Sequence, residues 1–157
     1  MYKYFFKRLF DFFISLVVLL CLSPLLLIIT IWLHFANKGA GVFFCQSRPG
    51  KNGKIFKIIK YKSMTDERDE HGNFLPDVQR LTSVGRFIRA TSIDELPQFI
   101  NVLMGDMALI GPRPLLTEYL PYYKEREKLR HVVRPGITGY TQVHGRNNLS
   151  WDERLEM

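Results

Sequence analysis

The sequence predicts a mixed α/β fold, helix-rich with a small β-hairpin, in a chain attached to a membrane. Three observations support this. Residues 12–35 form an apolar run without Asp, Glu, Lys or Arg, long enough to cross a bilayer as one helix. Residues 42–48 and 54–62 have the composition of strands and flank a turn. Residues 96–103 repeat apolar side chains at helical spacing.

The chain is basic, with 22 Lys and Arg residues against 15 acids, a net charge of +7 and a pI of about 9.5. Such chains bind nucleic acid, anionic lipid or phosphorylated ligands. Cys21 and Cys45 lie in unlike surroundings, so we expect no disulfide and a reducing, cytosolic setting. No His or Cys residues have zinc-ligand spacing, and the length suits one modest domain.

The uncharged run follows an interfacial lead-in of aromatic and cationic residues, and it is too long for a signal-peptide core. Ser23-Pro24 lies at its middle, where proline removes one backbone hydrogen bond and Ser23 can help to satisfy the freed carbonyl. Each half is about 17 Å long, roughly one leaflet. Cations on both flanks favour a re-entrant hairpin, but proline-kinked spanning helices are also common.

The two strand-like runs are joined by Pro49-Gly-Lys-Asn-Gly53, a strong turn signal, and predict a hairpin. Lys57, Lys60 and Lys62 lie close together on its second strand. They form either a basic edge that faces solvent or lipid, or a phosphate-binding group. Residues 64–80 are polar and acid-rich, and predict a surface excursion with a short helix.

A short amphipathic helix is predicted over residues 81–89, capped by Thr82 or Ser83, and it carries Arg89. A second helix follows, with Leu96, Phe99, Ile100 and Leu103 as its apolar stripe, Pro97 in its first turn and Gly105 as its stop. Later residues predict a surface helix at 115–130 interrupted by Pro121, loops at 134–139 and 144–148, and a strand at 140–143.

Asp94 and Glu95 are expected at the N-terminus of that second helix, where the positive field favours ionised carboxylates and nearby phosphate. Ser92 and Glu95 also match a capping box, so an ordinary structural role stands beside a chemical one. Arg89 precedes the two acids, and Arg113 follows on a loop stiffened by two prolines, which suits bidentate phosphate recognition. Acids flanked by fixed cations suggest a site for phosphates and a divalent metal.

Several motifs occur in order: Asp94-Glu-Leu-Pro-Gln98, Gly111-Pro-Arg-Pro114 and Arg134-Pro-Gly-Ile-Thr-Gly139. With them, nearly the whole chain resembles the bacterial sugar transferase family, the small monotopic phosphoglycosyl transferases that begin glycan and exopolysaccharide assembly on polyprenyl phosphate. That family usually continues well beyond the segment at Ser150-Trp151. The resemblance therefore predicts that this chain is a form shortened at its C-terminus.

The resemblance implies a re-entrant break at Ser23 and Pro24, a membrane hairpin over residues 1–36, and a cytosolic catalytic domain over residues 37–157. This domain would lie on the cytoplasmic face of the bacterial inner membrane. Asp94 would attack the sugar-bearing phosphate of a UDP-sugar, expel UMP and hold the phosphosugar until polyprenyl phosphate displaces it, a ping-pong phosphotransfer. The implied cofactor is Mg²⁺, with Asp94 as a ligand. Glu95 is implied as catalytic without a fixed role, and the predicted substrate-binding residues are Lys60, Arg89, Arg113 and Arg146.

Two other classes compete with this interpretation. A non-catalytic, membrane-anchored basic module would bind anionic lipid or a partner protein. A nucleic-acid-binding protein is disfavoured, because the sequence has no RNP-like or helix-turn-helix signature and this class leaves the uncharged run unexplained. No motif specifies the sugar or an oligomeric state.

Overall fold

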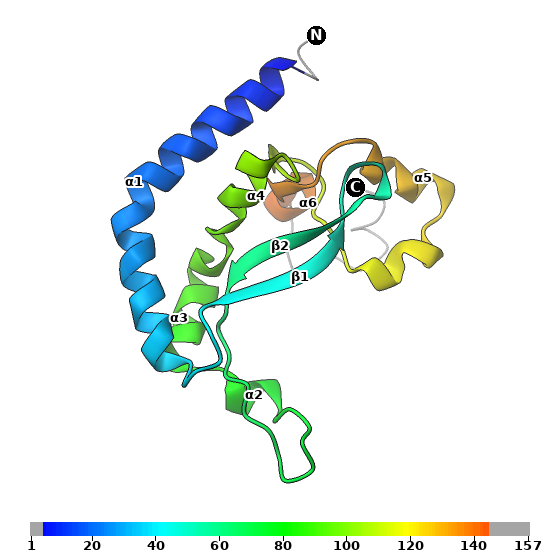
Figure 1. Ribbon diagram of the computed structural model, residues 1–157. Coiled ribbons are helices and arrows are strands. Elements are labelled where there is room, and N and C mark those ends of the chain that lie inside the picture. The colour runs from blue at the N-terminus through cyan, green and yellow to red at the C-terminus, as the bar shows by residue number, and fades with distance from the viewer. Residues whose placement is uncertain (1–4, 145–157) are drawn as a thin grey trace. The chain divides into compact units, whose positions relative to one another are not determined.

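The computed structural model describes residues 5–144 (Figure 1). The predicted mixture of helix and sheet is confirmed, as is the long apolar helix at the N-terminus. The helices and strands, in chain order, are α1 (Lys7–Ala36), β1 (Phe43–Pro49), β2 (Ile55–Tyr61), α2 (Asp77–Arg80), α3 (Ser83–Ala90), α4 (Gln98–Met104), β3 (Ala108–Ile110), α5 (Glu125–Lys128), β4 (Gly136–Thr138) and α6 (Tyr140–His144).

The chain forms two compact units. Unit 1 contains Met1–Val18, Gln46–Ile58 and Gln98–Met157, and unit 2 contains Leu19–Cys45 and Ile59–Pro97. Helix α1 and the β1–β2 hairpin each contribute residues to both units. The division expected at residue 36 is one of function, because it separates a membrane segment from a catalytic part. The two compact units do not test that division, so it stays a prediction.

Helix α1 is continuous over 30 residues with Pro24 inside it, so the two halves of the uncharged run belong to one helix. Ser23 Oγ donates a hydrogen bond of 2.8 Å to the carbonyl of Leu20. This carbonyl lies four residues before Pro24 and loses its usual partner there, because proline has no N–H. The predicted compensation by Ser23 is confirmed. By length and composition α1 could cross a membrane, and its re-entrant course stays a prediction.

The predicted hairpin is also confirmed, with β1 and β2 paired across a turn at residues 50–54. The amide of Gly50 donates to the carbonyl of Lys54 at 2.8 Å. Asn52 and Gly53 both adopt left-handed backbone angles, with φ of 56° and 74°. Asn and Gly tolerate this conformation best, which explains why these residues make the turn.

The core of unit 2 packs the C-terminal half of α1 against β2 and α3. Its buried side chains are Ile29, Leu33, Tyr61, Val84 and Ile88. The Tyr61 hydroxyl donates to the carbonyl of Leu26 in α1 at 3.0 Å. This half of α1 therefore has protein neighbours on one face.

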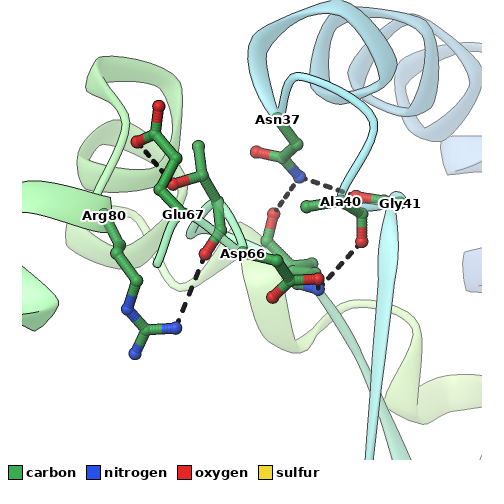
Figure 2. A network of polar contacts seen from close by, with 8 residues as sticks. Asn37, Ala40, Gly41, Asp66, Glu67 and Arg80 are labelled. Atoms are coloured by element: carbon green, nitrogen blue, oxygen red, sulfur yellow. Dashed lines mark hydrogen bonds and ion pairs between the residues drawn. The ribbon is translucent and has the colours of Figure 1, made fainter. Parts of the chain in front are cut away.

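A polar network fixes the end of α1 within unit 2 (Figure 2). Asn37 is buried, and its Nδ2 donates to the carbonyls of Gly41 at 2.8 Å and Lys62 at 2.7 Å. Lys38 forms an ion pair with Glu67 at 2.8 Å, which lowers the pKa of that carboxyl. The acid-rich excursion is therefore partly paired, and α2 is the short helix predicted within it.

In unit 1, Phe56, Ile58, Val102 and Met107 form the buried core. Strands β3 and β4 pair in parallel, with Ala108 opposite Gly136. A Cβ at Gly136 would lie 2.1 Å from the Gly111 nitrogen, so only glycine permits this close approach of the two backbones.

Two predictions for the C-terminal half were wrong, and a third was confirmed only in part. Residues 140–143 belong to α6, and β4 lies where a loop was expected. The helix expected over 115–130 is a 3₁₀ helix at Thr117–Tyr122, then α5 and another 3₁₀ turn at Leu129–Val132. Pro121 lies inside the first of these. Because proline has no N–H to donate, it interrupts the hydrogen bonds that a longer α-helix needs.

Helix α4 is held at its end by the N-terminal half of α1. The Arg8 guanidinium donates to the carbonyls of Val102 and Leu103 in the last turn of α4, where the Val102 carbonyl also accepts from the Gly105 amide. Asp11, buried in the same part of α1, accepts from the Leu109 amide at 3.4 Å. The predicted stop at Gly105 is confirmed, with φ of 94°.

The apolar stripe predicted for α4 is not its buried face. Gln98, Asn101 and Val102 are buried, whereas in the predicted stripe Ile100 is 38% exposed and the other members, Leu96, Phe99 and Leu103, are half-buried. Asn101 Nδ2 donates to the carbonyl of Lys57 at 2.8 Å, which explains how an amide replaces an apolar side chain there.

Candidate active site

Asp94 and Glu95 lie in a 3₁₀ turn, Ile93–Glu95, between α3 and α4. Helix α4 begins only at Gln98, so the expectation that the acids occupy its N-terminal turn was wrong. Ser92 has a left-handed φ of 58°, and its side chain makes no cap. The capping box is therefore also wrong, and the field of an α-helix N-terminus does not explain the chemistry of these carboxylates.

Glu95 pairs with Lys60 of β2, at 2.7 Å between Oε1 and Nζ. Both side chains are 20% exposed, so the pair is largely withdrawn from water. Lys60, predicted as a substrate ligand, thus lies in the cluster that contains the two acids. Its ammonium group is held by Glu95 and acts electrostatically on Asp94.

Burial raises the pKa of Asp94 above its ordinary value. The charges of Lys60 and Arg89 oppose this shift, and that of Glu95 adds to it. The expectation that the surroundings favour the ionised form of Asp94 was therefore wrong, because desolvation outweighs the two cations. A carboxylate with a raised pKa is more basic and poorly solvated, which favours its action as a nucleophile.

Arg89 reaches this cluster from α3. Its Nε donates to Ser63 Oγ at 2.8 Å, and Ser63 is itself buried. Helix α3 begins where Thr82 Oγ1 accepts from the Gly85 amide at 2.9 Å, which confirms Thr82 as the cap. Neither Ser63 nor Gly85 was singled out from the sequence, because nothing in their local pattern reveals a contact between segments far apart in the chain.

Gly85 allows α3 to lie directly against the backbone of Ser63. A Cβ added at Gly85 would lie 1.9 Å from the Ser63 carbonyl oxygen. We expect Gly85→Ala to lower the free energy of unfolding by about 1–3 kcal/mol, the usual range for overpacking. Denaturant unfolding in detergent measures this, with Arg86→Ala at an exposed position of α3 as the control. Equal stability of the two variants would contradict the close packing.

Arg113 belongs to unit 1, where it lies exposed between Pro112 and the buried Pro114. It lines a small pocket together with Arg130 and His131. Arg146 lies outside the described residues. Lys60, Arg89, Asp94 and Glu95 are thus brought together in unit 2, and the part played by Arg113 and Arg146 in the same site stays a prediction.

Among residues 5–144, no group of three or more His, Cys, Asp or Glu side chains is arranged to hold a metal ion. Asp94 offers a carboxylate, whereas Glu95 is engaged with Lys60. Mg²⁺ usually binds through one or two carboxylates together with substrate phosphates and water. The residues present therefore fit a Mg²⁺ ion that is shared with a bound diphosphate, and do not form an all-protein cage.

Comparison with known proteins gives a match to the family model described as bacterial sugar transferase over residues 2–157. The chain is 52% identical over 151 residues to the uncharacterized sugar transferase EpsL of Bacillus subtilis, covering 96% of this chain and 74% of that protein. It is 38% identical over 168 residues to the undecaprenyl-phosphate galactose phosphotransferase of Salmonella typhimurium, covering 96% of this chain and 35% of that protein.

A third relative, the UDP-glucose:undecaprenyl-phosphate glucose-1-phosphate transferase of Klebsiella pneumoniae, is 43% identical over 145 residues. The match covers 89% of this chain and 31% of that protein. The chain thus spans about three quarters of the first of these relatives and about a third of the other two.

Proposed function

The chain belongs to the bacterial sugar transferase family, and we propose that it moves a phosphosugar from a UDP-sugar to polyprenyl phosphate. Two relatives are named as undecaprenyl-phosphate sugar phosphotransferases, which supports this class of reaction. The observation that carries the proposal is Asp94, a partly buried carboxylate with a raised pKa that is influenced by the cations of Lys60 and Arg89.

In the proposed first step, an Asp94 carboxylate oxygen attacks the phosphorus that bears the sugar. The bond from this phosphorus to the bridging oxygen breaks, UMP leaves, and an acyl phosphate to the sugar phosphate forms. In the second step, a phosphate oxygen of polyprenyl phosphate attacks the same phosphorus. The acyl phosphate bond breaks, Asp94 returns as a carboxylate, and the sugar is carried on a polyprenyl diphosphate.

The neighbouring side chains suit this chemistry. Arg89 and Lys60 place positive charge where negative charge accumulates on the transferred phosphate. Glu95 fixes the Lys60 ammonium by their ion pair, so we assign it a positioning role. Mg²⁺, held by Asp94 and the diphosphate, would supply further neutralisation of charge between nucleophile and substrate.

We also propose the re-entrant course of α1 and a catalytic part at the cytoplasmic face of the membrane. The packing of α1 supports this. Within unit 1 its first turns contact α4 and β3 through Arg8 and Asp11, and within unit 2 Ile29 and Leu33 pack on β2 and α3. A simple spanning helix leaves its two ends on opposite sides of the bilayer, which does not suit a helix whose two halves both pack against elements outside the predicted membrane segment.

The reaction is tested by release of UMP from a panel of UDP-sugars. Because the proposed mechanism passes through a covalent intermediate, we expect up to one UMP per chain without acceptor, and continued turnover only after undecaprenyl phosphate is added. A membrane-anchored module without catalytic function releases no UMP under either condition. Release only when both substrates are present would argue for direct transfer without the intermediate.

A further inference from the structure

An exposed aromatic side chain of α3 lies directly beside the exposed side of α1, within unit 2 (Figure 1). The buried face of α3, with Val84 and Ile88, belongs to the core that it shares with α1. Phe87 lies outside that core and is 49% exposed. Its ring centre is 6.2 Å from that of Trp32 in α1. The surface of α3 at Phe87 and the surface of α1 at Trp32 are therefore continuous.

The exposed side of α1 at this point is apolar and uncharged. Ile28, Trp32 and Phe35 are spaced at i, i+4 and i+7, so they lie on one side of the helix, and all three are exposed. They belong to the uncharged run 12–35, which is long enough to cross a bilayer. In a membrane such a surface faces lipid chains. Because Phe87 adjoins Trp32, the lipid that covers α1 also reaches α3.

The neighbouring groups place α3 at the boundary between lipid chains and head groups. Tryptophan is enriched at this boundary. Asn37 lies five residues after Trp32, about 8 Å along the helix axis, and belongs to the polar network of Figure 2. Arg86 is exposed and lies about 100° from Phe87 around α3. An aromatic ring beside a cation suits a surface helix that buries its apolar side chains about 5–10 Å deep.

We propose that α3 is a second membrane-contacting element, with Phe87 among the lipid chains and Arg86 at the phosphates of anionic phospholipid. Ser83 and Ala90 are exposed, small and three or four residues from Phe87, so this side of α3 permits a close approach to head groups. The net charge of +7 favours an anionic surface. The proposal rests on the membrane attachment of α1 in the proposed function, but requires neither the transfer reaction nor the re-entrant course.

The test measures lipid contact of a fluorescent label at position 87 in the full chain in nanodiscs. Cys21 and Cys45 are first replaced by Ser, and Phe87→Cys provides the thiol to be labelled. The matched control is Phe74→Cys, because Phe74 is also 49% exposed but lies in the acid-rich excursion. We expect lipids with a nitroxide on the acyl chain to quench the label at 87 several-fold more than the label at 74. Iodide in the aqueous phase should quench the two labels in the reverse order.

Anionic lipid is expected to strengthen the contact through Arg86. When phosphatidylglycerol replaces phosphatidylcholine, quenching of the label at 87 by nitroxide lipid should rise. Arg86→Gln should lose this rise, because the cation that binds the head groups is removed. Arg126→Gln removes the same charge from an exposed position of α5 and should keep the rise. An equal rise in both variants contradicts the role assigned to Arg86.

Equal quenching by iodide at positions 87 and 74 overturns the proposal, since α3 then faces water. Protection from iodide without quenching by nitroxide lipid also overturns it, because a second copy or another protein then covers Phe87. Ile28→Cys reports on α1 alone: quenching by lipid there but not at 87 contradicts only the contact of α3, and its absence at both contradicts the membrane attachment of α1. Should Phe87→Cys not fold, Ala90→Cys provides the same comparison. Absence of UMP release from the unlabelled chain, with lipid quenching at 87 retained, contradicts only the proposed transfer.

Discussion

Asp94→Asn is expected to abolish UMP release while the chain still folds and inserts into membranes. Asparagine has nearly the shape of aspartate, but its amide cannot form the acyl phosphate that the proposed mechanism needs. We expect the single-turnover burst of UMP to vanish as well, because the first step fails. The measurement is UMP release from a UDP-sugar, with and without undecaprenyl phosphate. A suitable control is Asp77→Asn, an exposed aspartate in α2 whose partner is Arg80.

The same variant has a predictable effect on stability. Burial raises the pKa of Asp94 in the folded chain, so ionisation of this group opposes folding. Its contribution is favourable at pH values below the unfolded pKa and is lost as the pH rises through the folded pKa. At neutral pH, Asp94→Asn should therefore unfold at the same or a higher denaturant concentration than the wild type. Retained turnover, or a marked loss of stability, would falsify the assignment of a desolvated nucleophile.

Replacement of Ser23 and Pro24 together by Ala is expected to convert a re-entrant segment into a spanning helix. Alanine restores the N–H that Pro24 lacks and favours a straight helix by about 3 kcal/mol at that position. The Leu20 carbonyl then accepts from the backbone and no longer needs the Ser23 hydroxyl. The 24 uncharged residues 12–35 are already long enough to cross the bilayer.

Cysteine labelling in intact cells measures this change. Cys21 and Cys45 are first replaced, and Tyr2→Cys provides the only thiol for a membrane-impermeant reagent. We expect protection in the wild-type background and labelling after the double replacement. Leu22→Ala with Leu25→Ala adds two alanines but keeps the proline, and it should remain protected. Labelling at position 2 with the native Ser23 and Pro24 present would show that the segment spans.

Local features were determined by the sequence itself. The apolar run, the Asn-Gly turn of the hairpin, the Thr82 cap and the Gly105 stop all depend on residues close together in the chain. Even the partner of the carbonyl freed by Pro24 was predictable, because Ser23 is its sequence neighbour. For the same reason, Asp94 and Arg89 were candidates from composition and spacing before any fold was known.

The tertiary structure decided how these residues are used. Glu95 matches a cap by local pattern, yet it pairs with Lys60, 35 residues away. The buried face of α4 includes the polar Gln98 and Asn101 beside Val102, because Lys57 of β2 offers Asn101 a carbonyl that helical periodicity cannot reveal. The pKa of Asp94 is raised although cations surround it, since desolvation depends on everything that packs around the carboxylate. Sequence neighbours set backbone conformation, whereas burial and long-range charges exist only once the chain has folded.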